Sequence, residues 1–220
     1  LVGDADGVLV AGTTRTVLAW TGAVTIAPAG GDDSVRVELR GAAGASIAVE
    51  ASAGTDTLSV FGTSLREDVV VTLGQVLART GADAWVTITH GADEVSIDTG
   101  NGSDRVAVRG IAVPHTVATG SGDDLVLVGS GAASGDWTIG SGTLNGIGAL
   151  LTLDLGTTGD QAGLDTLVAS DAADAADNTG TLTATAITGL GMTGGIAYAG
   201  VEALTLQLGS GDDLLAVLGT

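Results

Sequence analysis

Short pairs of apolar residues, separated by a single residue, recur along the first two-thirds of the chain. Most pairs follow one another at steps of 9 to 12 residues. The two apolar side chains of a pair point to the same face of a β-strand, because side chains alternate between the faces of a strand. The pairs are Val24/Ile26, Val35/Val37, Ile47/Val49, Leu58/Val60, Val69/Val71, Val86/Ile88, Val95/Ile97, Val106/Val108, Val126/Val128 and Trp137/Ile139. The spacing predicts an all-β chain of many short strands.

Glycine and aspartate recur at the turns between these strands. The pattern is Gly-x-Asp, and an apolar residue follows two places after the aspartate. Glycine permits the positive φ angles of tight turns, and it makes up 37 of the 220 residues. The copies are Gly31/Asp33, Gly54/Asp56, Gly91/Asp93, Gly102/Asp104, Gly122/Asp124, Gly163/Asp165 and Gly211/Asp213. The repeating unit is therefore strand, Gly-Asp turn, strand.

The spacing of the turns favours a right-handed parallel β-helix or β-roll, a solenoid of about 20–24 residues per coil. Asp33, Asp56, Asp104 and Asp124 are separated by 23, 48 and 20 residues, and 48 residues is about two coils. We expect these four side chains in one column along an edge of the solenoid, with Asp93 on the opposite edge. The alternative is an antiparallel sandwich, which has strands at similar spacing.

The regularity of the repeat changes along the chain. Residues 1–150 are predicted to form regular solenoid coils, with GQVLARTGADA (74–84) as an insertion. Residues 151–220 are predicted to continue the solenoid, with a loop or short helical excursion near 169–180. Asp171, Asp174 and Asp177 in this excursion are expected to lie on a solvated face. The ends at Leu1 and Thr220 are those expected of a segment cut from a longer protein.

The charge of the chain restricts its partners. Seven basic residues, all arginine, stand against 26 acidic residues, for a formal net charge of −19. Nucleic acid and anionic membrane surfaces would be repelled, so neither is expected as a partner. No apolar run is long enough for membrane insertion. The chain has no cysteine, which excludes disulfides and thiolate metal sites.

Three turns resemble the nonapeptide of repeat-in-toxin (RTX) proteins, Gly-Gly-x-Gly-x-Asp-x-apolar-x. TGNGSDRVA (99–107), TGSGDDLVL (119–127) and LGSGDDLLA (208–216) match it except at the first glycine. In that family, carbonyls and aspartates of successive turns share Ca²⁺ ions, and the proteins are exported bacterial toxins, adhesins and surface layers. The resemblance implies an extracellular or bacterial cell-surface location. The full motifs are solitary here, where the family has them in tandem.

The resemblance also implies a set of calcium ligands. Calcium takes six to eight oxygen ligands from carboxylates and carbonyls. The candidate metal-binding residues are Asp33, Asp104, Asp123, Asp124, Asp212 and Asp213. The alternative is that each aspartate completes its turn by bonding to the backbone.

The predicted function is a structural repeat module of a giant secreted or cell-surface protein: a rod, a surface layer or an adhesin stalk. Its expected partners are further repeats of the same parent chain, with self-association end to end or side by side. No nucleophile–base set is evident, and His90 and His115 lie far apart in sequence, so no enzyme is expected; His115 is expected to be packed. The alternatives are a polysaccharide-acting β-helix enzyme and a carbohydrate- or ice-binding module. The small number of aromatic residues, five, disfavours sugar stacking.

Overall fold

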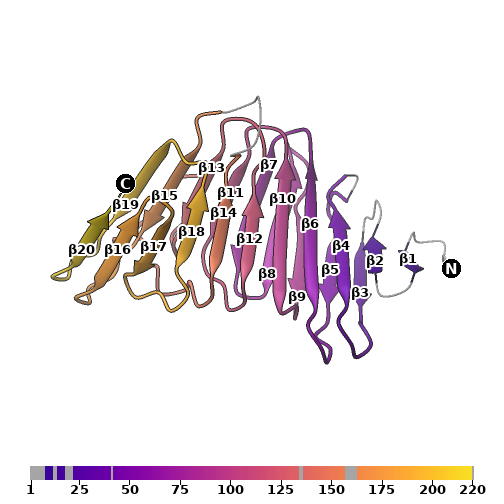
Figure 1. Cartoon of the computed structure of the whole chain (residues 1–220). Coiled ribbons are helices and arrows are strands. Elements are labelled where there is room, and N and C mark those ends of the chain that lie inside the picture. The colour runs from indigo at the N-terminus through magenta and orange to yellow at the C-terminus, as the bar shows by residue number, and fades with distance from the viewer. Residues whose placement is uncertain are drawn as a thin grey trace.

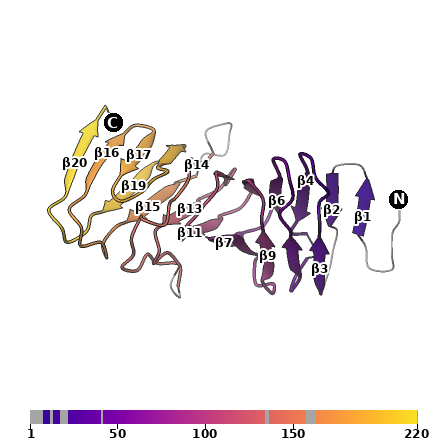
Figure 2. The same ribbon diagram turned by 90° about the horizontal axis from the view of Figure 1, so that it is seen from below.

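The computed structural model describes residues 8–11, 14–17, 22–40, 42–133, 136–156 and 163–219. Leu1 and Thr220, the predicted cut ends, lie outside the described residues. The described chain is all β, with twenty strands and no helix. The strands form two sheets in an elongated body, with the N-terminal and C-terminal strands at opposite ends (Figure 1). The view from below shows the sheets as separate layers (Figure 2).

The first sheet, sheet A, has eleven strands in the order β1-β2-β4-β6-β10-β12-β14-β18-β17-β16-β20. Their bounds are β1 Val8–Ala11, β2 Thr14–Val17, β4 Ser34–Glu38, β6 Thr57–Thr63, β10 Glu94–Gly100, β12 His115–Ala118, β14 Leu151–Asp154, β16 Thr179–Thr183, β17 Ala186–Gly189, β18 Ile196–Ala199 and β20 Leu214–Leu218.

The second sheet, sheet B, has nine strands in the order β19-β15-β13-β11-β7-β8-β9-β5-β3. Their bounds are β3 Ala23–Ile26, β5 Ser46–Val49, β7 Glu67–Thr72, β8 Gln75–Thr80, β9 Val86–His90, β11 Arg105–Val108, β13 Leu125–Val128, β15 Thr166–Ser170 and β19 Ala203–Gln207.

The hydrophobic core lies between the two sheets, and the apolar pairs face it. Val35 and Val37 of β4 are buried, and so are Val106 and Val108 of β11. Each such side chain stabilises the fold by about 1.5–3 kcal/mol relative to leaving it in water. The pair Trp137/Ile139 differs, because it packs on the outer face of sheet B in a second apolar cluster.

The predicted right-handed parallel β-helix or β-roll is wrong, because both sheets mix parallel and antiparallel strands. Among the described strands, thirteen pairings are parallel. Five are antiparallel: β1–β2, β7–β8, β8–β9, β16–β17 and β17–β18. The two sheets pack on each other as in the alternative sandwich, but most of their pairings are parallel.

Two inserted strands account for most of this difference. Residues 74–84, predicted to be an insertion, contain β8, which turns back from β7 and enters sheet B between β7 and β9. In sheet A, β17 lies between β16 and β18, antiparallel to both.

The predicted constant coil of about 20–24 residues is wrong as well. Turns that hydrogen-bond to each other lie 20, 23, 35, 37 or 41 residues apart in sequence. The inserted strands and the long connection between β13 and β14 lengthen some steps and not others. Residues 171–178, inside the predicted excursion, form turns between β15 and β16. No helix of the described chain is long and apolar enough to cross a membrane.

Candidate functional site

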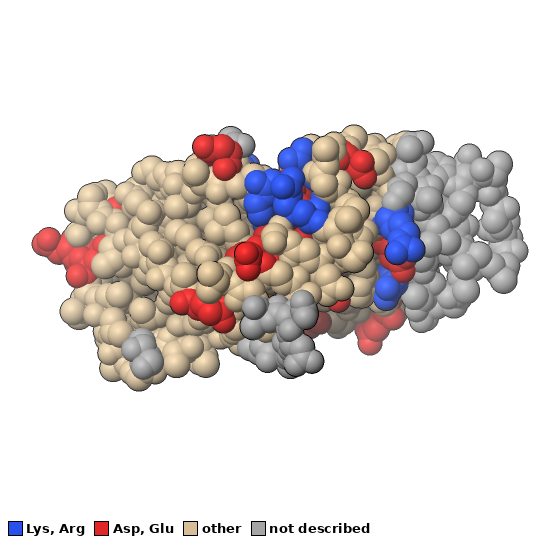
Figure 3. Space-filling model, turned by 90° about the horizontal axis from the view of Figure 1, so that it is seen from above, with Lys and Arg blue, Asp and Glu red and all other residues tan. Residues whose placement is uncertain are grey.

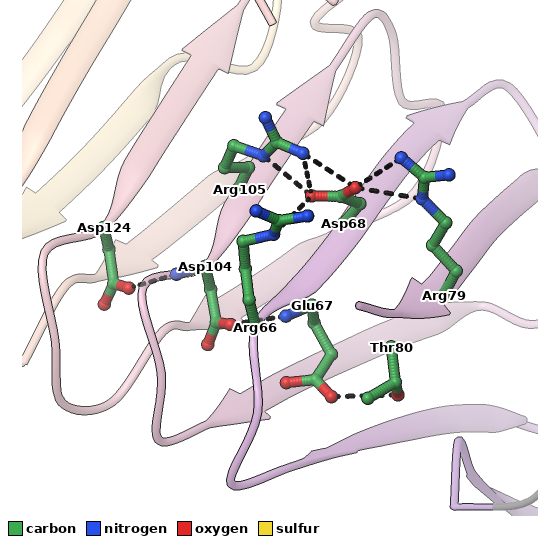
Figure 4. A network of polar contacts seen from close by, with 8 residues as sticks. All are labelled: Arg66, Glu67, Asp68, Arg79, Thr80, Asp104, Arg105 and Asp124. Carbon is green, nitrogen blue, oxygen red and sulfur yellow. Dashed lines mark hydrogen bonds and ion pairs between the residues drawn. The ribbon is translucent and has the colours of Figure 1, made fainter. Parts of the chain in front are cut away.

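Carboxylates of successive turns form a column where the strands of sheet B begin. The N–H of Asp104 donates to Asp124 Oδ1 (2.8 Å), and the N–H of Asp124 donates to Asp165 Oδ1 (2.9 Å). Glu67 and Glu202 extend the column: the N–H of Glu67 donates to Asp104 Oδ1 (2.6 Å), and the N–H of Asp165 donates to Glu202 Oε2 (2.8 Å). We call these five residues the long ladder; Figure 4 shows its first three members.

A second column, the short ladder, consists of Asp33, Asp56 and Asp93, which precede β4, β6 and β10 of sheet A. The N–H of Asp33 donates to Asp56 Oδ1 (3.1 Å), and the N–H of Asp56 donates to Asp93 Oδ2 (2.8 Å). The predicted single column of Asp33, Asp56, Asp104 and Asp124 is therefore wrong. Asp33 and Asp56 precede strands of sheet A, whereas Asp104 and Asp124 precede β11 and β13 of sheet B.

In the ladders, the N–H of one turn donates to the carboxylate of the next turn. The first residue of an Asp-Asp or Asp-Asn turn makes a bond that runs from the next turn back to it. Its carboxylate accepts an N–H from the next turn, while the N–H of the residue after it donates to that turn. Two neighbouring turns are thereby joined by a reciprocal pair of hydrogen bonds. The opposite bonds are Thr55 N–H to Asp32 Oδ1 (2.8 Å), Leu164 N–H to Asp123 Oδ1 (2.9 Å) and Asp212 N–H to Asp177 Oδ1 (2.8 Å).

The glycine of the turn is required by close contact between turns. A Cβ atom on Gly122 would lie 1.8 Å from the carbonyl oxygen of Gly102, and one on Gly163 would lie 1.8 Å from that of Gly122. Gly122 also has a φ of 132°, which L side chains rarely adopt. The Gly-x-Asp pattern thus has two separate causes: the glycine allows the approach, and the aspartate bonds the neighbouring turn.

The two ladders differ in electrostatics. Burial raises the pKa of Asp104 to about 6 and the pKa of Asp165 to about 6. The pKa of Asp124 is raised by burial too, and the charge of Asp104 adds to this. In the short ladder, hydrogen bonds led by the Ser52 hydroxyl lower the pKa of Asp56. Asp104, Asp124 and Asp165 therefore protonate more readily than a free aspartate, and Asp56 protonates less readily.

The six candidate calcium ligands lie at three separate places. Asp104, Asp123 and Asp124 lie in adjacent turns, Asp33 is in the short ladder, and Asp212 and Asp213 lie in the turn before β20. Among the described residues no group of three or more acidic, histidine or cysteine side chains is placed to bind a metal ion.

The carboxylates of Asp104 and Asp213 are taken up by hydrogen bonds within the chain. Both oxygens of Asp104 accept hydrogen bonds, from Glu67 N–H and from Thr99 Oγ1 (2.6 Å). Both oxygens of Asp213 accept as well, from the N–H groups of Asn178 (2.9 Å) and Gly209 (3.1 Å). Calcium stays a prediction from the resemblance.

The expected solvated face of Asp171, Asp174 and Asp177 is wrong for two of the three. Asp171 and Asp174 are buried, and Asp177 is exposed. Asp171 Oδ1 accepts the N–H of Leu144 (2.9 Å), so it ties the β13–β14 connection to this turn.

The C-terminal end of the body leaves apolar side chains and strand edges uncovered. β20 is the last strand of sheet A and β19 the last of sheet B, so each has one unpaired edge. Leu214, Val217 and Leu218 of β20 are all more than half exposed. In the adjoining turn, the Asp212 carboxylate accepts no hydrogen bond from any residue that the structure describes.

A basic cluster of arginines around Asp68 was not predicted from the sequence. Asp68 is fully buried and lies between Arg79 of β8 and Arg105 of β11, which are its direct partners in the two neighbouring strands. Arg66 also approaches it (Figure 4). The sequence signal for this cluster is the turn at Leu73–Gly74. A hairpin that closes at these two residues places Arg79 opposite Asp68.

The two histidines also meet, despite their separation in sequence. His115 of β12 is buried, which confirms it as a packed residue, and its ring centroid lies 6.0 Å from that of His90 in β9. The Val113 carbonyl oxygen lies 2.8 Å from His115 Nδ1, which places the proton on that nitrogen. Burial lowers the pKa of His90 to about 4 and also lowers the pKa of His115.

No family model matches the chain, and neither the curated proteins nor the solved structures include a match. The resemblance to RTX proteins therefore depends on the turn sequences alone.

Proposed function

We propose that the chain is a structural module of a longer β-rich assembly, in which units of this kind join end to end. The supporting observation is the uncovered C-terminal end, where an unpaired strand edge, exposed leucines and the turn at Asp212–Asp213 lie together. The extracellular or cell-surface location expected from the resemblance belongs to the same proposal.

The turn at this end has the chemistry for one more neighbour. Asp123 accepts an N–H from the following turn, and Asp177 does the same. Asp212 is the corresponding residue of the last turn, and its carboxylate is free to accept. The N–H of Asp213 bonds to Gly211 O (3.1 Å), whereas the N–H of Asp124 donates to the next aspartate. A further Gly-Asp turn would donate an N–H to the Asp212 carboxylate. Its aspartate would accept the N–H of Asp213 in place of the Gly211 carbonyl oxygen.

The apolar edge supports the same partner. An exposed strand edge pairs readily with another strand, and natural proteins usually protect such edges with charge, bulges or a cover. No Lys, Arg or Pro lies in β20, whose sequence is LLAVL. The side chains of a partner strand would lie beside Val217 on one face of β20 and beside Leu214 and Leu218 on the other. The occupant we propose is a second unit of the same kind, which a second copy of this chain can provide.

Analytical ultracentrifugation tests the proposal. Wild-type protein should form elongated dimers and longer species as its concentration rises, and Val217→Lys should remain monomeric because it places a charge in the edge. Leu73→Lys is the matched control, since Leu73 is exposed in the turn between β7 and β8, which lie in the middle of sheet B. A wild type that is monomeric at all concentrations, or association that persists in Val217→Lys, would overturn the proposal.

A further inference from the structure

The basic cluster holds more positive charge than its buried carboxylate needs. Arg79 donates to Asp68 Oδ2 through Nε (2.9 Å) and Nη2 (2.7 Å). Arg105 donates through Nε to Oδ1 (2.7 Å) and through Nη2 to Oδ2 (2.8 Å). These two arginines already satisfy the carboxylate. Arg66 is a third, and its Nε lies 3.6 Å from Oδ1, beyond hydrogen-bonding distance.

The third guanidinium therefore leaves its donors for an external group. The Arg66 side chain is 46% exposed, while Asp68 is completely buried. The carboxylate of the adjacent Glu67 points away from the guanidiniums, toward Thr80 (Figure 4). Three arginines against one aspartate leave two positive charges on a chain whose net charge is −19. Figure 3 shows one group of basic side chains over the middle of the molecule and a second group nearer one end of the same face, with acidic side chains beside both.

Two tryptophans flank the cluster. The Arg79 guanidinium carbon lies 4.6 Å from the centre of the Trp85 ring, and that of Arg105 lies 4.6 Å from the centre of the Trp137 ring. Trp85 is about one-third exposed, at 36%. Trp137 adopts a φ of 57°, which is rare and costly for a bulky residue. Three of the four aromatic residues that the structure describes carry an arginine over the ring, and two of those three are at this cluster.

We propose that this surface, defined as Arg66, Arg79, Arg105, Trp85 and Trp137, binds an acidic saccharide of the uronic acid class. A guanidinium recognises a carboxylate through paired N–H donors, and Asp68 already occupies that role between Arg79 and Arg105. In the proposed complex the uronate carboxylate binds Arg66, and an indole packs against the sugar ring. A compact acidic sugar also suits the local charge, since the rest of the acidic molecule repels a long, densely charged polyanion.

The test is a titration monitored by NMR through the indole N–H signals of Trp85 and Trp137. The probes are a galacturonic acid trisaccharide, a neutral galactose trisaccharide and inorganic sulfate. We expect saturable shifts of these signals with the galacturonic acid probe, none with the neutral probe, and weaker binding of sulfate. Sulfate that binds as tightly as the trisaccharide, or a neutral trisaccharide that binds equally, would overturn the assignment of an acidic saccharide.

Single substitutions test whether the saccharide binds at this surface. Arg66→Gln should weaken binding of the galacturonic acid probe by about fivefold or more, because it removes a charge-assisted contact. Arg36→Gln, at an arginine that is 43% exposed on β4 of sheet A, is the matched control and should change affinity by less than about twofold. Trp85→Leu keeps the charge and should also weaken binding. Absence of saturation in the wild type, an unchanged affinity in Arg66→Gln, or self-association through this surface in place of sugar binding would overturn the proposal.

Discussion

The backbone N–H of Asp104 donates a hydrogen bond to the carboxylate of Asp124, which lies 20 residues further along the chain. Both side chains are buried, and the same relationship recurs from Asp124 to Asp165. The aspartates of the Gly-Asp turns therefore connect one turn to the next, in addition to the pairing of the strands.

Removal of an acceptor from the long ladder should destabilise the fold. Asp124→Ala leaves the N–H of Asp104 buried without a partner, which costs about 1–3 kcal/mol of unfolding free energy. Asp124→Asn keeps the Oδ1 acceptor and should cost much less. Urea unfolding measures both. Asp83→Ala, at an exposed aspartate, is the control, and equal losses for Asp124→Ala and Asp83→Ala would contradict the role of the ladder.

Ionisation of the long-ladder aspartates should lower the free energy of unfolding as pH rises. The pKa of Asp104 and that of Asp165 are raised from 3.8 to about 6 in the folded chain. The folded state thus binds more protons than the unfolded state between these values, so the stabilisation present at low pH is lost as pH rises through about 6. The Asp104→Asn/Asp165→Asn double variant reduces this dependence, since only Asp124 of the three raised aspartates remains. Its Tm relative to wild type should be higher at pH 7 than at pH 5, and a difference that is constant with pH would contradict the prediction.

Protonation of the buried His90 should lower the free energy of unfolding as pH falls. Burial, with a smaller effect from the charge of His115, lowers the pKa of His90 from 6.5 to about 4. The unfolded state therefore binds a proton first, and stability present above pH 6.5 is lost as pH falls toward 4. Thermal unfolding of His90→Leu should show a smaller fall in Tm between pH 6.5 and 4.5 than wild type. A parallel fall in the two proteins would mean that His90 does not titrate as described.

The strands and turns could be predicted from the sequence because their causes are local. Val35 and Val37 alternate with polar residues, and Gly102 and Asp104 stand at a fixed distance from the next strand. The pairing of strands could not be predicted in this way. An apolar pair has the same sequence pattern whether the neighbouring strand is parallel or antiparallel. Residues 74–84, which contain β8, were therefore predicted to be an insertion outside the repeat.

The candidate sites depended on that pairing. Asp68 and Arg105 are 37 residues apart, and only the position of β7 beside β11 brings them together. The same reasoning explains the two ladders, because membership depends on the sheet that each following strand enters. Glu202 belongs to the same turn pattern with Glu in place of Asp, because Gly200 stands two residues before it and Leu204 two residues after it. Glu67 has Leu65 at the position of the glycine, so the Gly-Asp pattern could not identify it.

Close packing between turns should make Gly122 intolerant of a side chain. The added Cβ of Gly122→Ala would meet the Gly102 carbonyl oxygen, and its φ is unfavourable for alanine. We expect a loss of unfolding free energy of at least about 2 kcal/mol. Gly30→Ala is the matched control, because its Cβ would meet nothing closer than 3.7 Å. Similar Tm values for the two variants would show that the turns do not pack this closely.

Removal of divalent cations should leave the folded chain unaffected. The oxygens of Asp104 and Asp213 already accept hydrogen bonds from backbone and hydroxyl donors. The Tm in a chelator and the Tm in millimolar calcium should agree within about 2 °C, a small change on the scale of stability effects. A clear rise in Tm with calcium would support the cation predicted from the RTX resemblance.

Hydrogen exchange of the turn amides, measured by NMR, tests the connection between turns most directly. The N–H groups of Asp104, Asp124 and Asp165 precede their strands and would exchange rapidly if they faced solvent. We predict protection comparable to that of the neighbouring strand amides, with protection at Asp104 lost selectively in Asp124→Ala. Rapid exchange at all three amides in the wild type would contradict the ladder.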